Sequence, residues 1–194
     1  NPKHFDEIVK HFLVFLQKNT GRATMKLERV ITMKIETQCL HAGYTPGNGE
    51  PLTLPIYQST TYKYESTAQV AKLFDLTADG HMYSRISNPT VAAVEAKIAA
   101  LEGGVGALCT TSGQAASLIS VLNILSCGDH ILCTSTIYGG TINLFAVTLK
   151  RFGIEVSFVD ADASEEELKK QLHPNTKAVF AETIANPAIA VLDI

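Results

Sequence analysis

The chain has 194 residues, of which 46% are hydrophobic and 18% are charged, and its formal net charge is -3 at pH 7. These values are typical of globular proteins and exclude disordered, fibrous and coiled-coil classes. Acidic and basic residues are interspersed, without a basic stripe or a polybasic patch, so we expect neither nucleic acid nor membrane as a partner. Because the apolar runs are short and no signal-peptide pattern is present, we expect a cytoplasmic protein.

The four cysteines show no C-x-x-C pair, and we interpret all of them as reduced thiols. Cys109 and Cys133 lie in apolar runs typical of buried strands. Cys127, His130 and Cys133 have a spacing that could suggest a metal site. Because alternate residues of a strand face opposite sides, such a segment would hardly converge on one ion, and we expect no metal.

Residues 1–87 precede the regular part of the sequence. Apolar residues at helical spacing between Phe5 and Phe15 fit an amphipathic helix in residues 1–18. The sequence changes character near Lys34, so one hypothesis is that Met33 is the natural start and that residues 1–32 are an extension. Met25 and an earlier start stay open as alternatives. Residues 33–87 are predicted to form an arm, which is extended and loop-like from 44 to 64, and a short helix over 66–76 whose Ser66 and Gln69 have capping-box spacing.

A longer helix is expected to follow, with Asn88 as its N-cap and Pro89 as its first residue. Gly103 should end this helix. Its predicted buried stripe consists of Val91, Val94, Ile98 and Leu101.

From residue 88 to 194 the pattern predicts the first part of an α/β domain, incomplete at its C-terminus. Short apolar runs predict strands at 105–109, 130–134, 155–159 and 178–181, and helical stretches lie between them at 114–125, 139–152 and 164–172. The last helix opens with a capping box at Ser164 and Glu167. Strands separated by single helices predict a mainly parallel, doubly wound sheet with helices on both faces.

In such a sheet, ligands bind beyond the carboxyl ends of the strands. The segment from Thr110 to Ala116 brings backbone amides to a helix N-terminus, which suits a phosphate, although an ordinary turn capped by Ser112 fits equally well. Tyr138 is followed by two glycines and could stack on a flat ligand or lie at the rim with its hydroxyl in water. Glu182 to Pro187 brings an acid and an amide to the same end, or forms only an Asn-Pro turn.

Two common nucleotide motifs are excluded. The glycines of 103–106 precede a predicted strand instead of following one, so they do not fit a dinucleotide fingerprint, and no Walker motif follows any predicted strand.

The motifs together are specific. Tyr83-Ser84-Arg85-Ile86-Ser87-Asn88-Pro89-Thr90, Ser112-Gly113-Gln114-Ala115-Ala116, Tyr138-Gly139-Gly140-Thr141 and the segment from Glu182 to Pro187 occur in sequence order. Over residues 36–194 this arrangement resembles the cystathionine gamma-synthase-like family of Cys/Met metabolism enzymes, which depend on pyridoxal 5'-phosphate. The resemblance implies the large domain of a fold-type I aminotransferase-like enzyme, preceded by an extended arm.

The resemblance also implies roles for single residues. Ser112, Gly113 and Gln114 would cradle the cofactor phosphate, and Tyr138 would stack on its ring and assist proton transfer. Asn186 would lie near the cofactor's 3'-oxygen, with Glu182 as a neighbouring acid. The implied assembly is a homo-oligomer, a dimer of dimers, in which Tyr83 and Arg85 reach the phosphate of the neighbouring subunit, and a planar guanidinium suits that contact.

Finer features favour the sulfhydrylase branch of that family. They are the segments 40–44, 73–82 and 86–89, together with Gly140, which stands where typical methionine gamma-lyases carry a cysteine. The implied reaction is gamma-replacement on O-acetyl-L-homoserine by sulfide or a thiol. Cystathionine gamma-synthase or methionine gamma-lyase activity, and a non-catalytic phosphate-binding or subunit-interaction module, stay open as alternatives.

The family's cofactor-binding lysine has no counterpart in this sequence. Thr60 and Lys63 meet the expected spacing only in the arm, and Lys150 and Lys177 lie where surface roles are expected. We therefore expect the 194-residue chain alone to be inactive.

Overall fold

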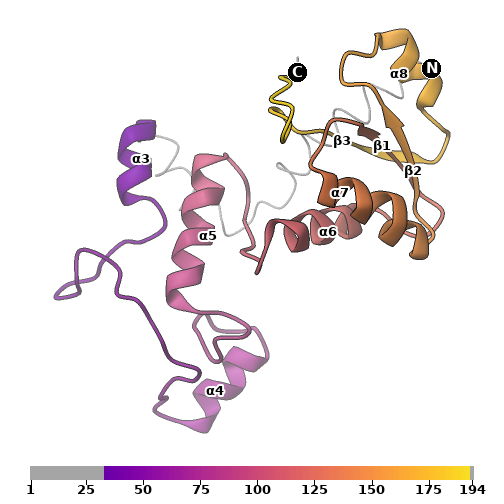
Figure 1. Ribbon diagram of the computed structural model, residues 1–194. Coiled ribbons are helices and arrows are strands. Elements are labelled where there is room, and N and C mark those ends of the chain that lie inside the picture. Colours follow the sequence, from indigo (N-terminus) through magenta and orange to yellow (C-terminus); the bar gives the residue numbers. More distant parts are fainter. Residues whose placement is uncertain (1–32, 193–194) are drawn as a thin grey trace. The chain divides into compact units, whose positions relative to one another are not determined.

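The computed structural model describes residues 33–192 (Figure 1). The extension 1–32 and the helix predicted within it lie outside the described residues. The described part falls into two compact units, residues 33–109 and 110–192. No helix in 33–192 is long and apolar enough to cross a membrane.

The unit of residues 110–192 is built on a three-stranded parallel sheet. Its strands are β1 (His130–Thr134), β2 (Glu155–Val159) and β3 (Thr176–Phe180), in the order β2-β1-β3. All five residues of β1 are buried, as expected for a central strand covered on both faces. The predicted parallel sheet is thus confirmed, with β3 beginning two residues earlier than expected.

Helices cover both faces of this sheet. In Figure 1, α6 (Gly113–Ile124) and α7 (Gly139–Asn143) lie on one side and α8 (Glu165–Gln171) on the other. The capping box that begins α8 is confirmed, because the Glu167 carboxylate accepts from the Ser164 backbone N–H at 2.9 Å and the Ser164 hydroxyl accepts from the Glu167 N–H at 3.4 Å.

The single α-helix predicted at 139–152 is wrong in its middle. After α7 the chain continues as a π-helix, η1 (Leu144–Leu149), which buries Phe145 and Leu149. The Phe145 ring packs edge-on against Phe180 at 4.9 Å between ring centroids. Phe145 and Leu149 are four residues apart, a spacing that α- and π-helical turns share, so the apolar pattern predicts a helix here without revealing its π-helical register.

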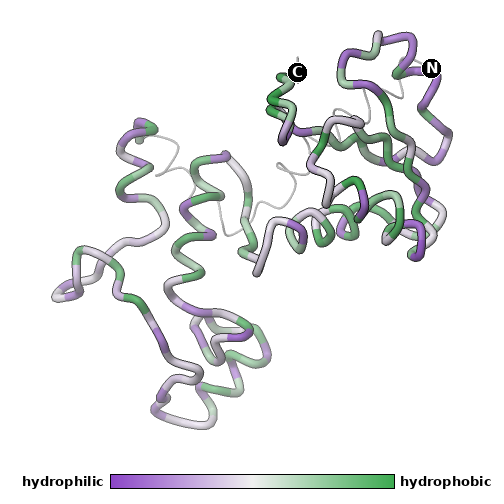
Figure 2. The backbone as a smooth tube through the Cα atoms, in the orientation of Figure 1, coloured by the Kyte–Doolittle hydropathy of each residue, from purple (hydrophilic) through white to green (hydrophobic). Residues whose placement is uncertain are grey.

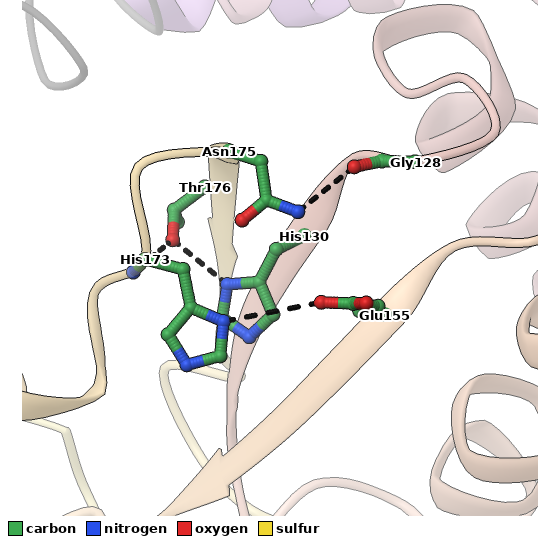
Figure 3. Close-up of polar contacts among 6 residues, drawn as sticks. All are labelled: Gly128, His130, Glu155, His173, Asn175 and Thr176. Atoms are coloured by element: carbon green, nitrogen blue, oxygen red, sulfur yellow. Dashed lines mark hydrogen bonds and ion pairs between the residues drawn. The ribbon is translucent and has the colours of Figure 1, made fainter.

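The amino end of the sheet carries a buried histidine (Figure 3). His130 has no exposed surface, its Nδ1 lies 2.8 Å from the Thr176 hydroxyl, and its ring stacks on His173 at 4.1 Å. Its Nε2 has no partner among residues 33–192. Burial lowers the pKa of His130, and the neighbouring His173 lowers that pKa further, while Glu155 opposes both.

The unit of residues 33–109 is formed by α3 (Ile35–His41), α4 (Thr67–Phe74) and α5 (Pro89–Leu101). Asn88 caps α5 and Pro89 is its first residue, as predicted. Residues 44–64 form no helix or named strand, in agreement with the predicted arm. Gly43 has a φ of +87°, and a Cβ added there would lie 2.2 Å from the Ala93 carbonyl oxygen, so only glycine allows this approach to α5.

Four predictions for this unit differ from the structure, in whole or in part. Residues 105–109 form no strand and Cys109 is exposed, because no described strand pairs with this segment. The predicted helix over 66–76 is confirmed as α4, but it ends at Phe74. Its capping box is only partly formed, because the Ser66 hydroxyl accepts from the Gln69 N–H but the Gln69 side chain accepts from Glu65 instead of Ser66.

The predicted buried stripe of α5 is also wrong. Val91, Val94 and Ile98 are 42 to 48% exposed, and α5 buries Ala99 instead. Figure 2 shows hydrophobic residues along α5. Val91, Val94 and Ile98 are exposed because no other described residues of this unit cover their face of α5.

Candidate functional site

A pocket of about 360 Å³ lies where the sequence predicts ligands to bind, beyond the carboxyl ends of the strands. Its lining comes from the start of α6, from the loop after β1 with α7, and from the loop after β3. The lining residues are Ser112, Gly113, Gln114, Ser117, Tyr138, Thr141 and Glu182. Parallel strands end at the same edge of a sheet, which explains why Tyr138, after β1, meets Glu182, after β3. The start of α6 follows no strand, and it joins this edge through the Gln114 side chain, which donates to the Thr141 hydroxyl of α7.

The start of α6 supplies backbone donors to this pocket. The Ser112 hydroxyl caps the helix by accepting from the Ala115 N–H at 3.1 Å. The N–H groups of Gly113 and Gln114 have no acceptor within residues 33–192. A Cβ added at Gly113 would meet no atom within 4 Å, so the space beside these amides is open. A helix N-terminus with free amides and open space in front of it suits an anion.

Two lining residues were missed from the sequence. Thr141 is buried and its hydroxyl accepts from the Gln114 side-chain amide at 3.0 Å, which joins α6 to α7. Ser117 lies four residues after Gly113 and therefore on the same face of α6. The four-residue spacing could have identified Ser117, whereas the contact of Thr141 depends on how the two helices pack.

Tyr138 is held by its backbone and leaves its ring half-exposed. Its N–H donates to the Glu182 carboxylate at 3.1 Å, and its side chain is 47% exposed. A Cβ added at Gly140 would lie 2.5 Å from the Tyr138 ring carbon Cε1. The ring therefore lies over Gly140, and the absence of a side chain there permits its position.

The chemistry of the lining fits a phosphate that is bound mainly by neutral donors. The polar groups of the lining are mainly amides and hydroxyls, and its acidic residue is Glu182. The lining residues include no lysine or arginine. Lys150 and Lys177 are both exposed. A phosphate bound here would therefore take its cationic partner from outside this lining.

Asn186 is not among the residues that line the pocket. It is exposed in the turn between Ile184 and Val191, which form an isolated antiparallel bridge, and its peptide bond to Pro187 is cis. Its predicted place near the cofactor stays a prediction.

Tyr83 and Arg85 belong to the unit of residues 33–109. Tyr83 pairs with Thr61 of the arm in an antiparallel bridge. The exposed Arg85 guanidinium lies 5.2 Å from the centroid of the Tyr83 ring, within the range of a cation–π contact. An exposed positive charge thus lies beside the half-buried Tyr83 ring.

The suggested metal ligands do not assemble. The described residues contain no cluster of three His, Cys, Asp or Glu side chains that could hold an ion. Cys133 is buried, and burial, with the nearby negative charge of Glu182, raises the pKa of its thiol to about 12.

Comparison with known proteins connects this geometry to a family. The profile of the Cys/Met metabolism PLP-dependent enzyme family matches residues 36–194. The chain is 47% identical over 160 residues to an O-acetyl-L-homoserine sulfhydrylase of Corynebacterium glutamicum, covering 82% of this chain and 37% of that protein. It is 46% identical over 166 residues to O-acetyl-L-homoserine sulfhydrylase 1 of Thermus thermophilus, covering 84% and 39%.

A solved structure gives the same picture for the fold. A Campylobacter jejuni protein described as an O-acetylhomoserine (thiol)-lyase superposes with a TM-score of 0.75 at 40% identity, covering 84% of this chain and 40% of that one. Its structure carries a pyridoxyl-lysine phosphate. The chain thus spans about two fifths of the length of these relatives.

Proposed function

Because the chain belongs to the Cys/Met metabolism PLP-dependent enzyme family, we propose that the whole protein catalyses gamma-replacement on O-acetyl-L-homoserine, with sulfide or a thiol as the second substrate. The products would be homocysteine, or a thioether, and acetate. The observation that carries this proposal is the pocket that joins Ser112, Gly113, Gln114, Tyr138 and Glu182. Relatives that are 43 to 47% identical and named O-acetyl-L-homoserine sulfhydrylases support the choice of substrate.

In this proposal the start of α6 binds the cofactor phosphate through the Gly113 and Gln114 amides and the Ser112 hydroxyl. The Tyr138 ring packs against the flat cofactor ring, and its hydroxyl moves a proton at the substrate amine. Glu182 fixes the Tyr138 backbone, and Asn186 lies near the cofactor's 3'-oxygen. When bound, pyridoxal phosphate stabilises negative charge on the carbons next to the substrate amine.

The cation missing from the pocket lining would come from a second subunit. Arg85 carries an exposed positive charge beside the Tyr83 ring, and a guanidinium binds two phosphate oxygens at once. We therefore propose a homo-oligomer, a dimer of dimers, in which these two residues reach the neighbouring cofactor phosphate. We further propose a cytoplasmic location, which suits the exposed free thiols of Cys39, Cys109 and Cys127.

The test is an assay of the purified whole protein with O-acetylhomoserine and sulfide, run beside cystathionine and methionine as alternative substrates. We expect homocysteine and acetate to form in equal amounts, and much slower turnover of the other two substrates. Faster release of methanethiol from methionine, or of cysteine from cystathionine, would assign the protein to another branch of the family.

A further inference from the structure

We propose that Asn88 is a positioning residue for the segment that carries Tyr83 and Arg85, and that it acts through Ser84. This inference rests on the proposed function, in which Arg85 binds the cofactor phosphate of a neighbouring subunit. Asn88 is only 8% exposed although its side chain is polar. A buried amide must be satisfied by specific partners, and those partners show what it holds together.

The carbonyl oxygen and the NH₂ group of the Asn88 side chain bind different parts of the unit. Its carbonyl oxygen caps α5 by accepting from the Thr90 N–H at 2.9 Å and the Val91 N–H at 3.4 Å. Its NH₂ group lies 2.9 Å from the Tyr57 carbonyl oxygen, 3.1 Å from the Ser84 hydroxyl oxygen and 3.3 Å from the Tyr62 hydroxyl oxygen, all of which can accept. The oxygen therefore stabilises the helix, while the NH₂ group ties the arm and Ser84 to the helix start.

Ser84 lies between Tyr83 and Arg85, and both its backbone and its hydroxyl form hydrogen bonds to the arm. Its backbone N–H donates to the Thr60 carbonyl at 2.9 Å, and its hydroxyl donates to the Ser59 carbonyl. The Tyr62 hydroxyl lies 3.0 Å from the Ser84 hydroxyl. Because the residue between them is fixed, the backbones of Tyr83 and Arg85 are fixed as well.

This arrangement matters because Arg85 itself is exposed and forms no ion pair within residues 33–192. A long side chain on a loose loop loses conformational entropy when it binds a phosphate. Because hydrogen bonds already hold the backbone at Ser84, the backbone loses less conformational entropy when Arg85 binds a phosphate. Asn88 should therefore increase cofactor affinity without touching the cofactor.

Single substitutions can separate the two functions of the Asn88 side chain, which are capping α5 and holding Ser84. Asn88→Asp keeps the capping oxygen but replaces the NH₂ donor with an acceptor, and Ser84→Ala removes the pinned hydroxyl without adding charge. Tyr62→Phe is a milder variant that keeps the ring. Ser66→Ala is the matched control, because it removes the cap of α4 in the same unit and has no hydrogen bond to Ser84.

The experiment measures the dissociation constant of pyridoxal phosphate from the whole protein, together with thermal unfolding of each variant. We expect Arg85→Ala to weaken binding by roughly tenfold or more, and Asn88→Asp and Ser84→Ala to weaken it by about three- to tenfold. Ser66→Ala should lower the melting temperature but leave binding unchanged. The double variant Asn88→Asp/Arg85→Ala should bind pyridoxal phosphate no more weakly than Arg85→Ala alone, because Asn88 affects binding only through the position of Arg85.

The outcomes separate this inference from the proposed function. If Arg85→Ala does not change cofactor affinity, the proposed role of Arg85 is wrong and the inference falls with it. If Arg85→Ala weakens binding while Asn88→Asp and Ser84→Ala do not, the inference is wrong and the proposed function stands. Additive losses in the double variant would likewise overturn positioning through Arg85. Should Asn88→Asp fail to fold, Ser84→Ala and Tyr62→Phe decide the question.

Discussion

The ring of Tyr138 occupies space that a side chain at residue 140 would need. We therefore predict that Gly140→Ala displaces this ring, because the added Cβ would start 2.5 Å from it. The ring is 47% exposed and can move, so the loss should fall on cofactor binding more than on stability. Spectroscopic titration with pyridoxal phosphate, beside thermal unfolding, measures both.

Gly139→Ala is the matched control, because a Cβ at Gly139 meets no atom within 4 Å. It should leave cofactor binding close to that of the original protein. Equal effects of the two substitutions would show that the ring position does not depend on Gly140.

Cys133 is predicted to be the least reactive of the four thiols. With a pKa of about 12, roughly one thiol in ten thousand is ionised at pH 8, and its side chain is fully buried. Iodoacetamide at pH 8 should therefore label Cys39, Cys109 and Cys127 in the folded protein, and Cys133 only after unfolding in guanidinium. Peptide mass spectrometry measures this, and early labelling of Cys133 would contradict the buried position of β1.

At the scale of elements, the amino end of the sheet should be sensitive to acid. The pKa of His130 in the folded protein is lowered, whereas an unfolded histidine titrates near 6.5. Below about pH 6.5 the unfolded chain binds a proton that the folded chain does not, so the free energy of unfolding falls as pH falls. One such group contributes at most about 1.4 kcal/mol per pH unit.

Urea unfolding at pH 7.5 and pH 5.5 measures this change. His130→Gln should reduce the difference between the two pH values even if it lowers stability at both. His173→Gln, which removes the stacked ring shown in Figure 3, should reduce it less, because burial is the main cause of the shift. If the free energy of unfolding changes equally between the two pH values in the original protein and in both variants, the acid sensitivity comes from other groups.

The capping box of α8 gives a second prediction at this scale. Ser164→Ala removes the hydroxyl that accepts from the Glu167 N–H and should lower the free energy of unfolding by about 1 kcal/mol. The urea midpoint at pH 7.5 measures this. Ser135→Ala, at an exposed position outside any helix, is the control and should have a smaller effect.

At the scale of the whole molecule, the exposed apolar faces should decide how the 194-residue chain behaves in solution. Val91, Val94 and Ile98 on α5 are 42 to 48% exposed, and contiguous apolar patches promote association. We predict that replacing all three with glutamine reduces light scattering and binding of a hydrophobic dye. Circular dichroism provides the control, because helix content should change little. Unchanged dye binding would show that these side chains are not the exposed surface responsible.

Local chemistry by itself determined much of this protein. Asn88 and Pro89 begin α5, Ser164 and Glu167 begin α8, and the apolar run at 130–134 forms a buried strand, as predicted. Caps and strand runs are readable because their partners lie within a few residues. Tyr138 and Glu182 also line one pocket, because each follows a parallel strand and such strands end at one edge of the sheet.

Only the tertiary structure decided what depends on distant neighbours. The apolar run at 105–109 forms no strand because no described strand pairs with it, and the apolar stripe of α5 is exposed because the same unit does not cover it. Thr141 enters the pocket through its contact with Gln114, and Asn88 reaches Tyr57 across 31 residues. Such contacts between residues far apart in the chain arise when elements pack together, and no local sequence pattern encodes them.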